Sequence, residues 1–210
     1  TIAPSYYSNL GYGSDFTYRY YLNRRSSGQW FASFLQQTQL PNVAGVDQPR
    51  SDDWRLRGRI SGQHMQRVTN TLRLRGQVSV VSDREYLQQL SNSGTQRASP
   101  SGASTLLATQ RLPYGSAYFL GQYLQPLNSG GPDTFQRFPE VGYVLPNTSP
   151  FGLPLLMNLD GNFVNFYREQ GFTVNRMDFM PGITTDVIDV GHVIGLTPHF
   201  KFKEIYYTRG

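Results

Sequence analysis

Five arginines alternate with apolar or small residues in one stretch, WRLRGRISGQHMQRVTNTLRLRGQVSVVSD at positions 54–83. Successive side chains of a β-strand point to opposite faces, so a hairpin with this pattern carries all five on one face. Helical spacing would spread them around a helix surface instead. The arginines of this face are Arg55, Arg57, Arg59, Arg73 and Arg75. Such a basic face suits an anionic partner: nucleic acid, an anionic surface or anionic lipid.

No set of residues in the sequence is suited to catalysis or metal binding. His64 is predicted at a turn, and His192 and His199 are too far apart on one predicted strand for a joint metal site. The glycine-rich segments 11–13 and 129–131 are predicted to be turns, because no helix follows them to complete a phosphate loop. We therefore expect no enzyme activity, no cofactor and no metal ion.

The composition is typical of an all-β protein. The 210 residues include 14 Tyr, 13 Phe and 21 Gly, and only 16% are charged. The net charge is +5, and among the 19 Lys and Arg residues only Lys201 and Lys203 are lysines. The absence of Cys excludes disulfides, thiol catalysis and cysteine-based zinc sites from this sequence. A run of about 18 apolar residues, which would predict a transmembrane helix, is also missing.

About ten strands are predicted, each near the ~9–11 residues that a tilted membrane-spanning strand needs. They are 15–23, 29–37, the two arms of hairpin 54–83, 103–112, 116–125, 136–145, 153–167, 175–184 and 192–207. Short connections (24–28, 65–69, 113–115, 147–152, 185–191) alternate with longer ones (38–53, 82–102, 126–135, 168–174). Outer-membrane barrels show this alternation, with short periplasmic turns and long extracellular loops. The sequence predicts an antiparallel transmembrane β-barrel sheet; the alternative is a soluble all-β protein whose apolar residues face a core.

In a barrel, the two faces of the hairpin meet different surroundings. The residues predicted to face lipid are Leu56, Ile60, Leu72, Leu74, Val78 and Val80. The arginines, with Lys201 and Lys203 of the last strand, are predicted to face a wet lumen. Tyrosines near strand ends, among them Tyr20, Tyr86 and Tyr114, fit an aromatic girdle at the membrane interface.

Four longer strings spread across most of the chain occur in a fixed order. They are YYSNLGYGSDFTYRYYLNRRSSG (6–28), VSDREYL (81–87), FPEVGYVLPNTSPFGLPLLMNLDGNFVNFYRE (138–169) and LTPHFKFKEIYYT (196–208). This set resembles the barrel region of the LptD family, also called organic solvent tolerance proteins. The resemblance implies a single domain over residues 1–210, about the first half of a large barrel, without the family's periplasmic jellyroll and later strands. An open antiparallel sheet is therefore expected rather than a closed cylinder.

The resemblance also implies a function in the outer membrane of a Gram-negative bacterium. It implies a translocon component that assembles lipopolysaccharide at the cell surface. The implied partners are lipopolysaccharide, outer-membrane lipids, an LptE-type lipoprotein plug and a periplasmic LptA-type bridge, and no nucleic acid. Lipopolysaccharide carries phosphates, to which guanidinium groups donate bidentate hydrogen bonds, so the basic lumen face would contact it. Alternatively, the arginines pair with luminal carboxylates or with a plug and stiffen a wide barrel.

Two other functions remain open from the residues alone. One is a small, complete outer-membrane barrel enzyme, a protease or lipase, and the other is a passive porin or an unrelated transporter. A self-contained barrel is expected to finish in a strand with a terminal aromatic residue, whereas this sequence ends in YYTRG. That ending favours part of a larger barrel, and a stop codon directly after Gly210 would contradict the LptD-type interpretation.

Overall fold

Strands make up nearly all of the computed structural model of this chain. The structure describes residues 1–7, 11–37, 55–83, 86–91, 94–97, 99, 101–127, 134–149, 155–168, 171–185, 188–190 and 194–209. Within these residues, a 12-stranded sheet accounts for most of the chain, and two further strands form a separate pair. Helix is restricted there to two short segments, α1 (Tyr86–Leu90) and α2 (Gly94–Arg97).

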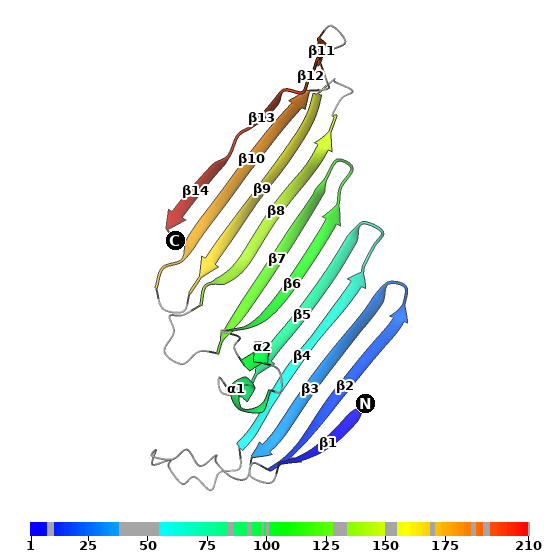
Figure 1. Ribbon diagram of the computed structural model, residues 1–210, viewed down its shortest axis with the longest axis vertical. Coiled ribbons are helices and arrows are strands. Elements are labelled where there is room, and N and C mark those ends of the chain that lie inside the picture. The colour runs from blue at the N-terminus through cyan, green and yellow to red at the C-terminus, as the bar shows by residue number, and fades with distance from the viewer. Residues whose placement is uncertain are drawn as a thin grey trace. The chain divides into compact units, whose positions relative to one another are not determined.

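The strands of the sheet lie side by side in the order of the sequence (Figure 1). They are β1 (Ile2–Tyr7), β2 (Gly11–Asn23), β3 (Ser26–Gln37), β4 (Arg55–Arg67), β5 (Leu72–Val81), β6 (Ser101–Arg111), β7 (Ser116–Pro126), β8 (Gln136–Thr148), β9 (Leu155–Tyr167), β10 (Val174–Thr185), β13 (His199–Lys201) and β14 (Glu204–Arg209). Neighbouring strands run antiparallel, and β1 does not pair with β13 or β14 in this order. The predicted fold class, an open up-and-down sheet of the barrel type, is confirmed.

At the N-terminus the predicted boundaries were wrong. Strand β1 precedes the first predicted strand, and β2 begins at Gly11, so the glycines of 11–13 do not form a turn. A Cβ on Gly13 would lie 2.8 Å from Ser5 Oγ and 2.9 Å from the carbonyl oxygen of Phe34. Glycine is needed here because the neighbouring strands approach closely, which is a common reason for glycine inside a strand.

At the C-terminus the single predicted strand 192–207 is divided. The segment β12 (Ile194–Leu196) pairs with β11 (Ile188–Val190) outside the main sheet, while β13 and β14 both pair with β10. Gly182 lies opposite Lys201, and Phe179 lies opposite Glu204. These pairs have the same register, so β13 and β14 are two parts of one interrupted strand.

Connection lengths follow the predicted alternation in part. Short turns follow β2, β4 and β6, as expected. The connection from β10 to β13 is long, contrary to the short turn predicted at 185–191, because it contains the β11–β12 pair. The predicted loop 82–102 contains α1 and α2, and the predicted loop 38–53 lies outside the described residues.

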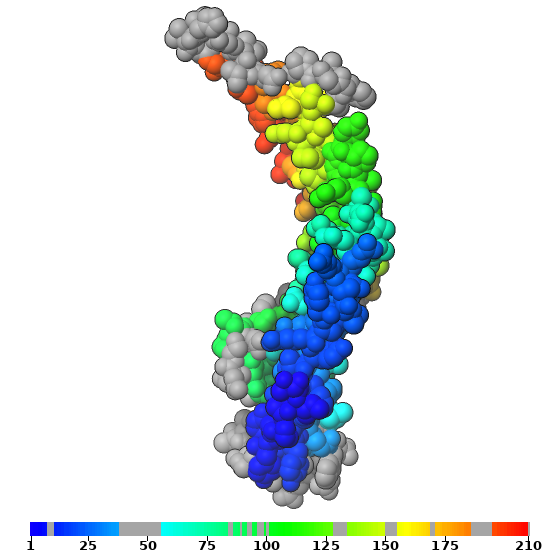
Figure 2. All heavy atoms as spheres, turned by 90° about the vertical axis from the view of Figure 1, so that its right-hand side faces the viewer, coloured from blue at the N-terminus to red at the C-terminus, as the bar shows by residue number. Residues whose placement is uncertain are grey.

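The chain divides into two compact units, and each is described by itself. Unit 1 comprises Thr1–Gln66, Gly76–Ser104 and Leu124–Pro132; unit 2 comprises Arg67–Arg75, Thr105–Tyr123 and Asp133–Gly210. In unit 1, the helical segment projects from one face of the strands (Figure 2). A buried apolar cluster of Val81, Tyr86, Leu87 and Leu127 holds it there. The described helices are too short and too polar to cross a membrane.

Candidate functional site

The face of unit 1 that α1 covers also carries the arginines of β4. Directly opposed residues of an antiparallel pair point to the same side of a sheet. Ser33 of β3 lies opposite both Asp15 of β2 and Arg59 of β4, and Leu35 lies opposite Arg57. We call this side the polar face of unit 1. The same registers add Thr17, Arg19, Gln29, Ser61 and Gln63 to it.

Arg57 is engaged by other side chains of the polar face. Its Nε donates to Asp83 Oδ2 at 2.9 Å and its Nη2 to Asp83 Oδ1 at 2.6 Å, a bidentate pair. Its Nη1 donates to Gln37 Oε1 at 3.2 Å, and the Tyr86 ring lies 5.8 Å from the guanidinium carbon. Arg57 is buried. These contacts connect β3, β4 and the start of the helical segment.

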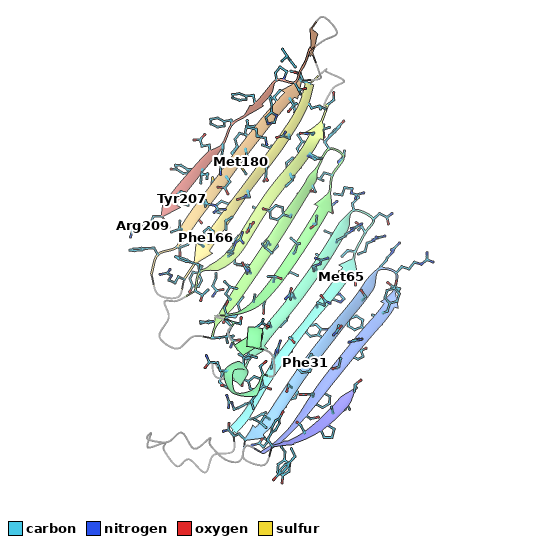
Figure 3. The ribbon with its side chains drawn as sticks, viewed as in Figure 1. Phe31, Met65, Phe166, Met180, Tyr207 and Arg209 are labelled. Atoms are coloured by element: carbon cyan, nitrogen blue, oxygen red, sulfur yellow. The ribbon has the colours of Figure 1, made fainter. Side chains whose placement is uncertain are left out.

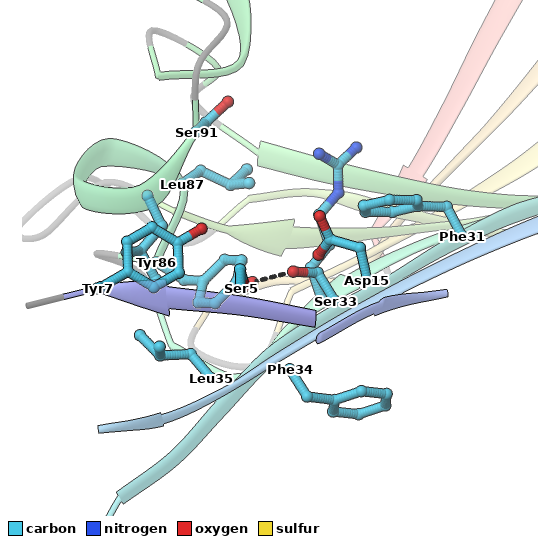
Figure 4. A pocket seen from close by; sticks show the side chains of 12 residues that line it. Ser5, Tyr7, Asp15, Phe31, Ser33, Phe34, Leu35, Tyr86, Leu87 and Ser91 are labelled. Atoms are coloured by element: carbon cyan, nitrogen blue, oxygen red, sulfur yellow. Dashed lines mark hydrogen bonds between the residues drawn. The ribbon is translucent and has the colours of Figure 1, made fainter. Parts of the chain in front are cut away.

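Tyr86 of α1 connects the helical segment (α1 and α2) with the strands beneath it. Its hydroxyl donates to Ser33 Oγ at 3.0 Å (Figure 4). Burial raises the pKa of the Tyr86 phenol above its ordinary value, partly offset by the Ser33 hydrogen bond, so the group stays a neutral donor. Tyr86 is buried, so the prediction that it belongs to an exposed aromatic girdle was wrong. Its aromatic ring packs against the polar face of unit 1.

Beneath α1 lies a cavity of about 160 Å³, which we call the helix pocket. Asp15, Ser33 and Arg59 line it from the strands, and Tyr86 and Leu87 line it from α1 (Figure 4). The pocket combines a carboxylate, a guanidinium and apolar side chains. The helix pocket is too small for a lipid. We therefore interpret its lining side chains as contacts that hold α1 against the polar face of unit 1.

The opposite face of unit 1 is apolar and exposed. Leu56 and Ile60, both predicted to face lipid, are 66% and 44% exposed and lie on this side of β4. The Trp30 ring occupies the space above Gly62, where a Cβ would lie 2.4 Å from a ring carbon. Small residues in this strand thus make room for large aromatic neighbours.

The remaining residues predicted to face lipid lie on β5. Val80 is exposed, while Leu72, Leu74 and Val78 are half-buried. All four alternate with the arginines of that strand.

The tyrosine hydroxyl of Tyr20 and Nδ1 of His64 form a hydrogen bond on the apolar side, with their rings stacked 5.9 Å apart. His64 therefore lies within β4 and not in a turn as predicted. Nδ1 of His199 lies 2.7 Å from Thr184 Oγ1, while His192 lies outside the described residues. In the part of the chain that the structure describes, no group of three His, Asp or Glu residues could hold a metal ion.

Unit 2 contains a network of charged side chains that sequence reasoning missed. Tyr118 donates to Glu140 Oε1 at 3.0 Å, and Arg137 pairs with the other oxygen of the same carboxylate. Arg176 Nη2 lies 2.9 Å from Asp178 Oδ2. Glu140 and Asp178 are only 5% and 9% exposed. The only sequence signal was the proximity of opposite charges within a strand, which predicts nothing about burial.

Register places this network on one side of unit 2. Val164, completely buried, lies opposite both Glu140 and Arg176. Tyr207 of β14 also lies opposite Arg176. Figure 3 shows Phe166 on β9 and Tyr207 on β14, the two strands that flank β10. We call this side the polar face of unit 2.

A larger cavity, of about 490 Å³, lies at the ends of the strands in unit 2, where β4 turns into β5 and β6 into β7. We call it the turn hollow. Arg73, Thr109, Arg111, Tyr114 and Ser116 are among the residues that line it. Arg73 belongs to the predicted lumen set, whereas Arg111 and Tyr114 do not.

The other predicted lumen residues are distributed over both units. Arg75 is exposed and lies two residues after Arg73 on β5. Lys201 is exposed and opposite Gly182, on the polar face of unit 2. Lys203 is exposed in the interruption between β13 and β14. The side chain of Arg55 lies outside what the structure describes. Arg75, Lys201 and Lys203 belong to unit 2, and Arg55 belongs to unit 1.

An up-and-down sheet with one exposed aromatic face and one polar face is the arrangement of a transmembrane β-barrel wall, since a soluble sandwich covers its apolar face. The family model LptD: LPS transport system D matches residues 55–208, well over half of the chain. The chain therefore belongs to the LptD family, an outer-membrane family of lipopolysaccharide transport, and the predicted resemblance is confirmed. No curated protein matches the chain.

Proposed function

We propose that this chain forms part of the barrel wall of an outer-membrane translocon that assembles lipopolysaccharide at the surface of a Gram-negative bacterium. The observation that carries the proposal is the opposition of faces in unit 1. Leu56 and Ile60 stand exposed on one side, while Arg57, Arg59 and α1 occupy the other. The family match supports the transport role.

In this proposal the apolar face contacts outer-membrane lipid and the polar face lines the passage. Burying the exposed apolar side chains in lipid stabilises the protein by about 25 cal/mol for each Å² of apolar surface removed from water. The polar face stays hydrated and offers hydrogen-bond donors to phosphates and sugars. Residues 1–210 then belong to one barrel domain, which an LptE-type lipoprotein plugs and an LptA-type bridge supplies.

Within this proposal, the surroundings of the basic residues support two different roles. Arg57 is held by Asp83 and Gln37, so it stabilises the wall. Arg73, Lys201 and Lys203 are exposed and can meet an anionic glycolipid in passage. Substitution of Arg57 should therefore disturb the structure, whereas substitution of Arg73, Lys201 or Lys203 should reduce transport.

The proposal can be tested by adding negative charge to the polar side without changing side-chain size. Gln63 and Gln77 are exposed strand residues, and Gln63 lies on the polar face of unit 1. In the full-length protein, the double variant Gln63→Glu/Gln77→Glu should reduce newly made lipopolysaccharide at the cell surface severalfold, because carboxylates repel its phosphates.

The matched control keeps both side chains neutral, as Gln63→Met/Gln77→Met. Surface lipopolysaccharide in this variant should equal that of the wild type. Equal delivery by the Glu and wild-type proteins, with both barrels assembled, would contradict the proposal. Equal losses in the Glu and Met variants would contradict it as well, because they would show a structural effect rather than a charge effect.

A further inference from the structure

The turn hollow is lined by cations without a carboxylate. Arg73 and Arg111 contribute guanidinium groups, while Asn70, Thr71, Thr109 and Ser116 contribute neutral polar groups. No Asp or Glu is among the described residues that line it. Both arginines are exposed, so solvent or a ligand can reach them. The hollow thus holds uncompensated positive charge.

Three other arginines of the described chain form ion pairs with carboxylates. Arg57 pairs with Asp83, Arg137 with Glu140, and Arg176 with Asp178. Neither Arg73 nor Arg111 forms an ion pair with a described residue. The ion pairs of Arg57, Arg137 and Arg176 can be explained as contacts that stiffen the sheet. The same explanation does not apply to Arg73 and Arg111 of the turn hollow.

The walls of the turn hollow are fixed by hydrogen bonds within one turn and between the β4–β5 turn and β6. The backbone N–H of Arg111 donates to the Thr71 carbonyl at 2.9 Å, and Gln110 Nε2 donates to Thr71 Oγ1 at 3.0 Å. In the next turn, the Leu112 N–H donates to the Gly115 carbonyl at 2.8 Å. A preformed site loses less conformational entropy on binding than a mobile one.

We infer that the turn hollow binds a phosphate group of the transported glycolipid through Arg73 and Arg111. This inference rests on the proposed function and adds to it a ligand group and a location. Guanidinium groups donate paired hydrogen bonds to phosphate oxygens. The hollow lies at the short-turn ends of its strands, which in outer-membrane barrels are the periplasmic ends. It therefore receives the headgroup where the glycolipid enters the barrel.

The test uses the full-length protein in outer-membrane vesicles with a photo-crosslinking residue at Ser116, which lines the turn hollow. Arg73→Gln/Arg111→Gln should lower lipopolysaccharide adducts at Ser116 about tenfold, the scale of a lost charged hydrogen bond. Arg24→Gln/Arg25→Gln is the matched control. It removes the same charge from an exposed turn of unit 1 that does not line the hollow.

A second crosslinking position at Ser61, on the polar face of unit 1, separates this inference from the proposed function. Unchanged adducts at Ser116 in the Arg73/Arg111 variant, with normal adducts at Ser61, would overturn the inference and leave the function standing. Adducts at neither position in the unsubstituted protein would overturn both. Heat-dependent gel mobility confirms that each barrel is assembled.

The source of the phosphate is tested with purified full-length protein. Lipopolysaccharide treated with phosphatase should give weak Ser116 adducts. Inorganic phosphate should displace intact lipopolysaccharide only when it is in large molar excess, because the lipid adds contacts of its own. Equal adducts from dephosphorylated lipopolysaccharide would contradict phosphate recognition. Displacement by inorganic phosphate at a concentration equal to that of lipopolysaccharide would show a site for free anions and would contradict preferential glycolipid binding there.

Discussion

At the scale of single residues, the arginines of the polar faces have unequal surroundings. Arg57 is buried and satisfied by Asp83 and Gln37, whereas Arg73 is exposed in a hollow without carboxylates. The sequence predicted the shared orientation of such arginines from alternation alone. It could not predict their partners, because Asp83 is 26 residues from Arg57 and only the register between strands brings them together.

The Arg57→Gln substitution should loosen the helical segment. It removes the bidentate contact to the partly exposed Asp83, a loss of roughly 1–3 kcal/mol. Limited proteolysis between α1 and α2 in the full-length barrel should therefore accelerate about tenfold or more. The control Arg24→Gln, in an exposed turn, should not change the rate. Equal cleavage rates for the two variants would show that the pair does not secure α1.

Tyr86 should make the seating of α1 sensitive to alkaline pH. Burial raises its pKa, so the folded state keeps the proton at pH values where an unfolded tyrosine, with a pKa of 10.0, loses it. Protection of α1 from proteolysis should be constant below pH 10 and should fall as the pH rises further. In the Tyr86→Phe variant, the protection of α1 should fall less steeply above pH 10. Identical pH profiles for the variant and the wild type would show that ionisation of Tyr86 does not release α1.

At the scale of elements, alternation and turn residues predicted most strands, and tertiary contacts decided the exceptions. The hairpin of β4 and β5 follows local alternation of Arg with apolar residues. Strand β1 and the start of β2 were missed because Gly13 resembles a turn glycine, although close packing against Ser5 and Phe34 requires it. The helical segment was missed because its stability comes from the buried cluster around Tyr86 and not from local helix signals.

Glycine substitutions should distinguish close packing from open strand positions. A Cβ on Gly115 would lie 2.5 Å from the Val144 carbonyl oxygen, so Gly115→Ala should destabilise the β7–β8 pairing by about 1–3 kcal/mol. Gly76 has no atom within 4 Å of such a Cβ, so Gly76→Ala should be neutral or stabilising by up to about 1 kcal/mol. Urea denaturation of the full-length barrel measures both. A Gly76→Ala loss as large as that of Gly115→Ala would contradict this packing.

At the scale of the whole molecule, the family defines the context in which these elements act. The LptD match covers residues 55–208 and connects the sheet with lipopolysaccharide transport in the outer membrane. The fold class and the family could be predicted from the sequence, because strand alternation and ordered strings are local signals. The turn hollow could not, since it combines Arg73 and Arg111 from separate hairpins. The charged network around Glu140 could not be predicted either, because the burial of that carboxylate and its contact with Tyr118 depend on how β7 and β8 pair.

The central claim is that lipopolysaccharide passes along the polar face, and neighbouring positions of β4 test it most directly. Ser61 lies on the polar face, whereas Ile60 lies on the apolar face at nearly the same depth. With photo-crosslinking residues at each position in the full-length protein, pulse-labelled lipopolysaccharide should form early, transient adducts at Ser61. Adducts at Ile60 should appear only later, after label has reached the outer leaflet. Early adducts at Ile60 and none at Ser61 would contradict the account.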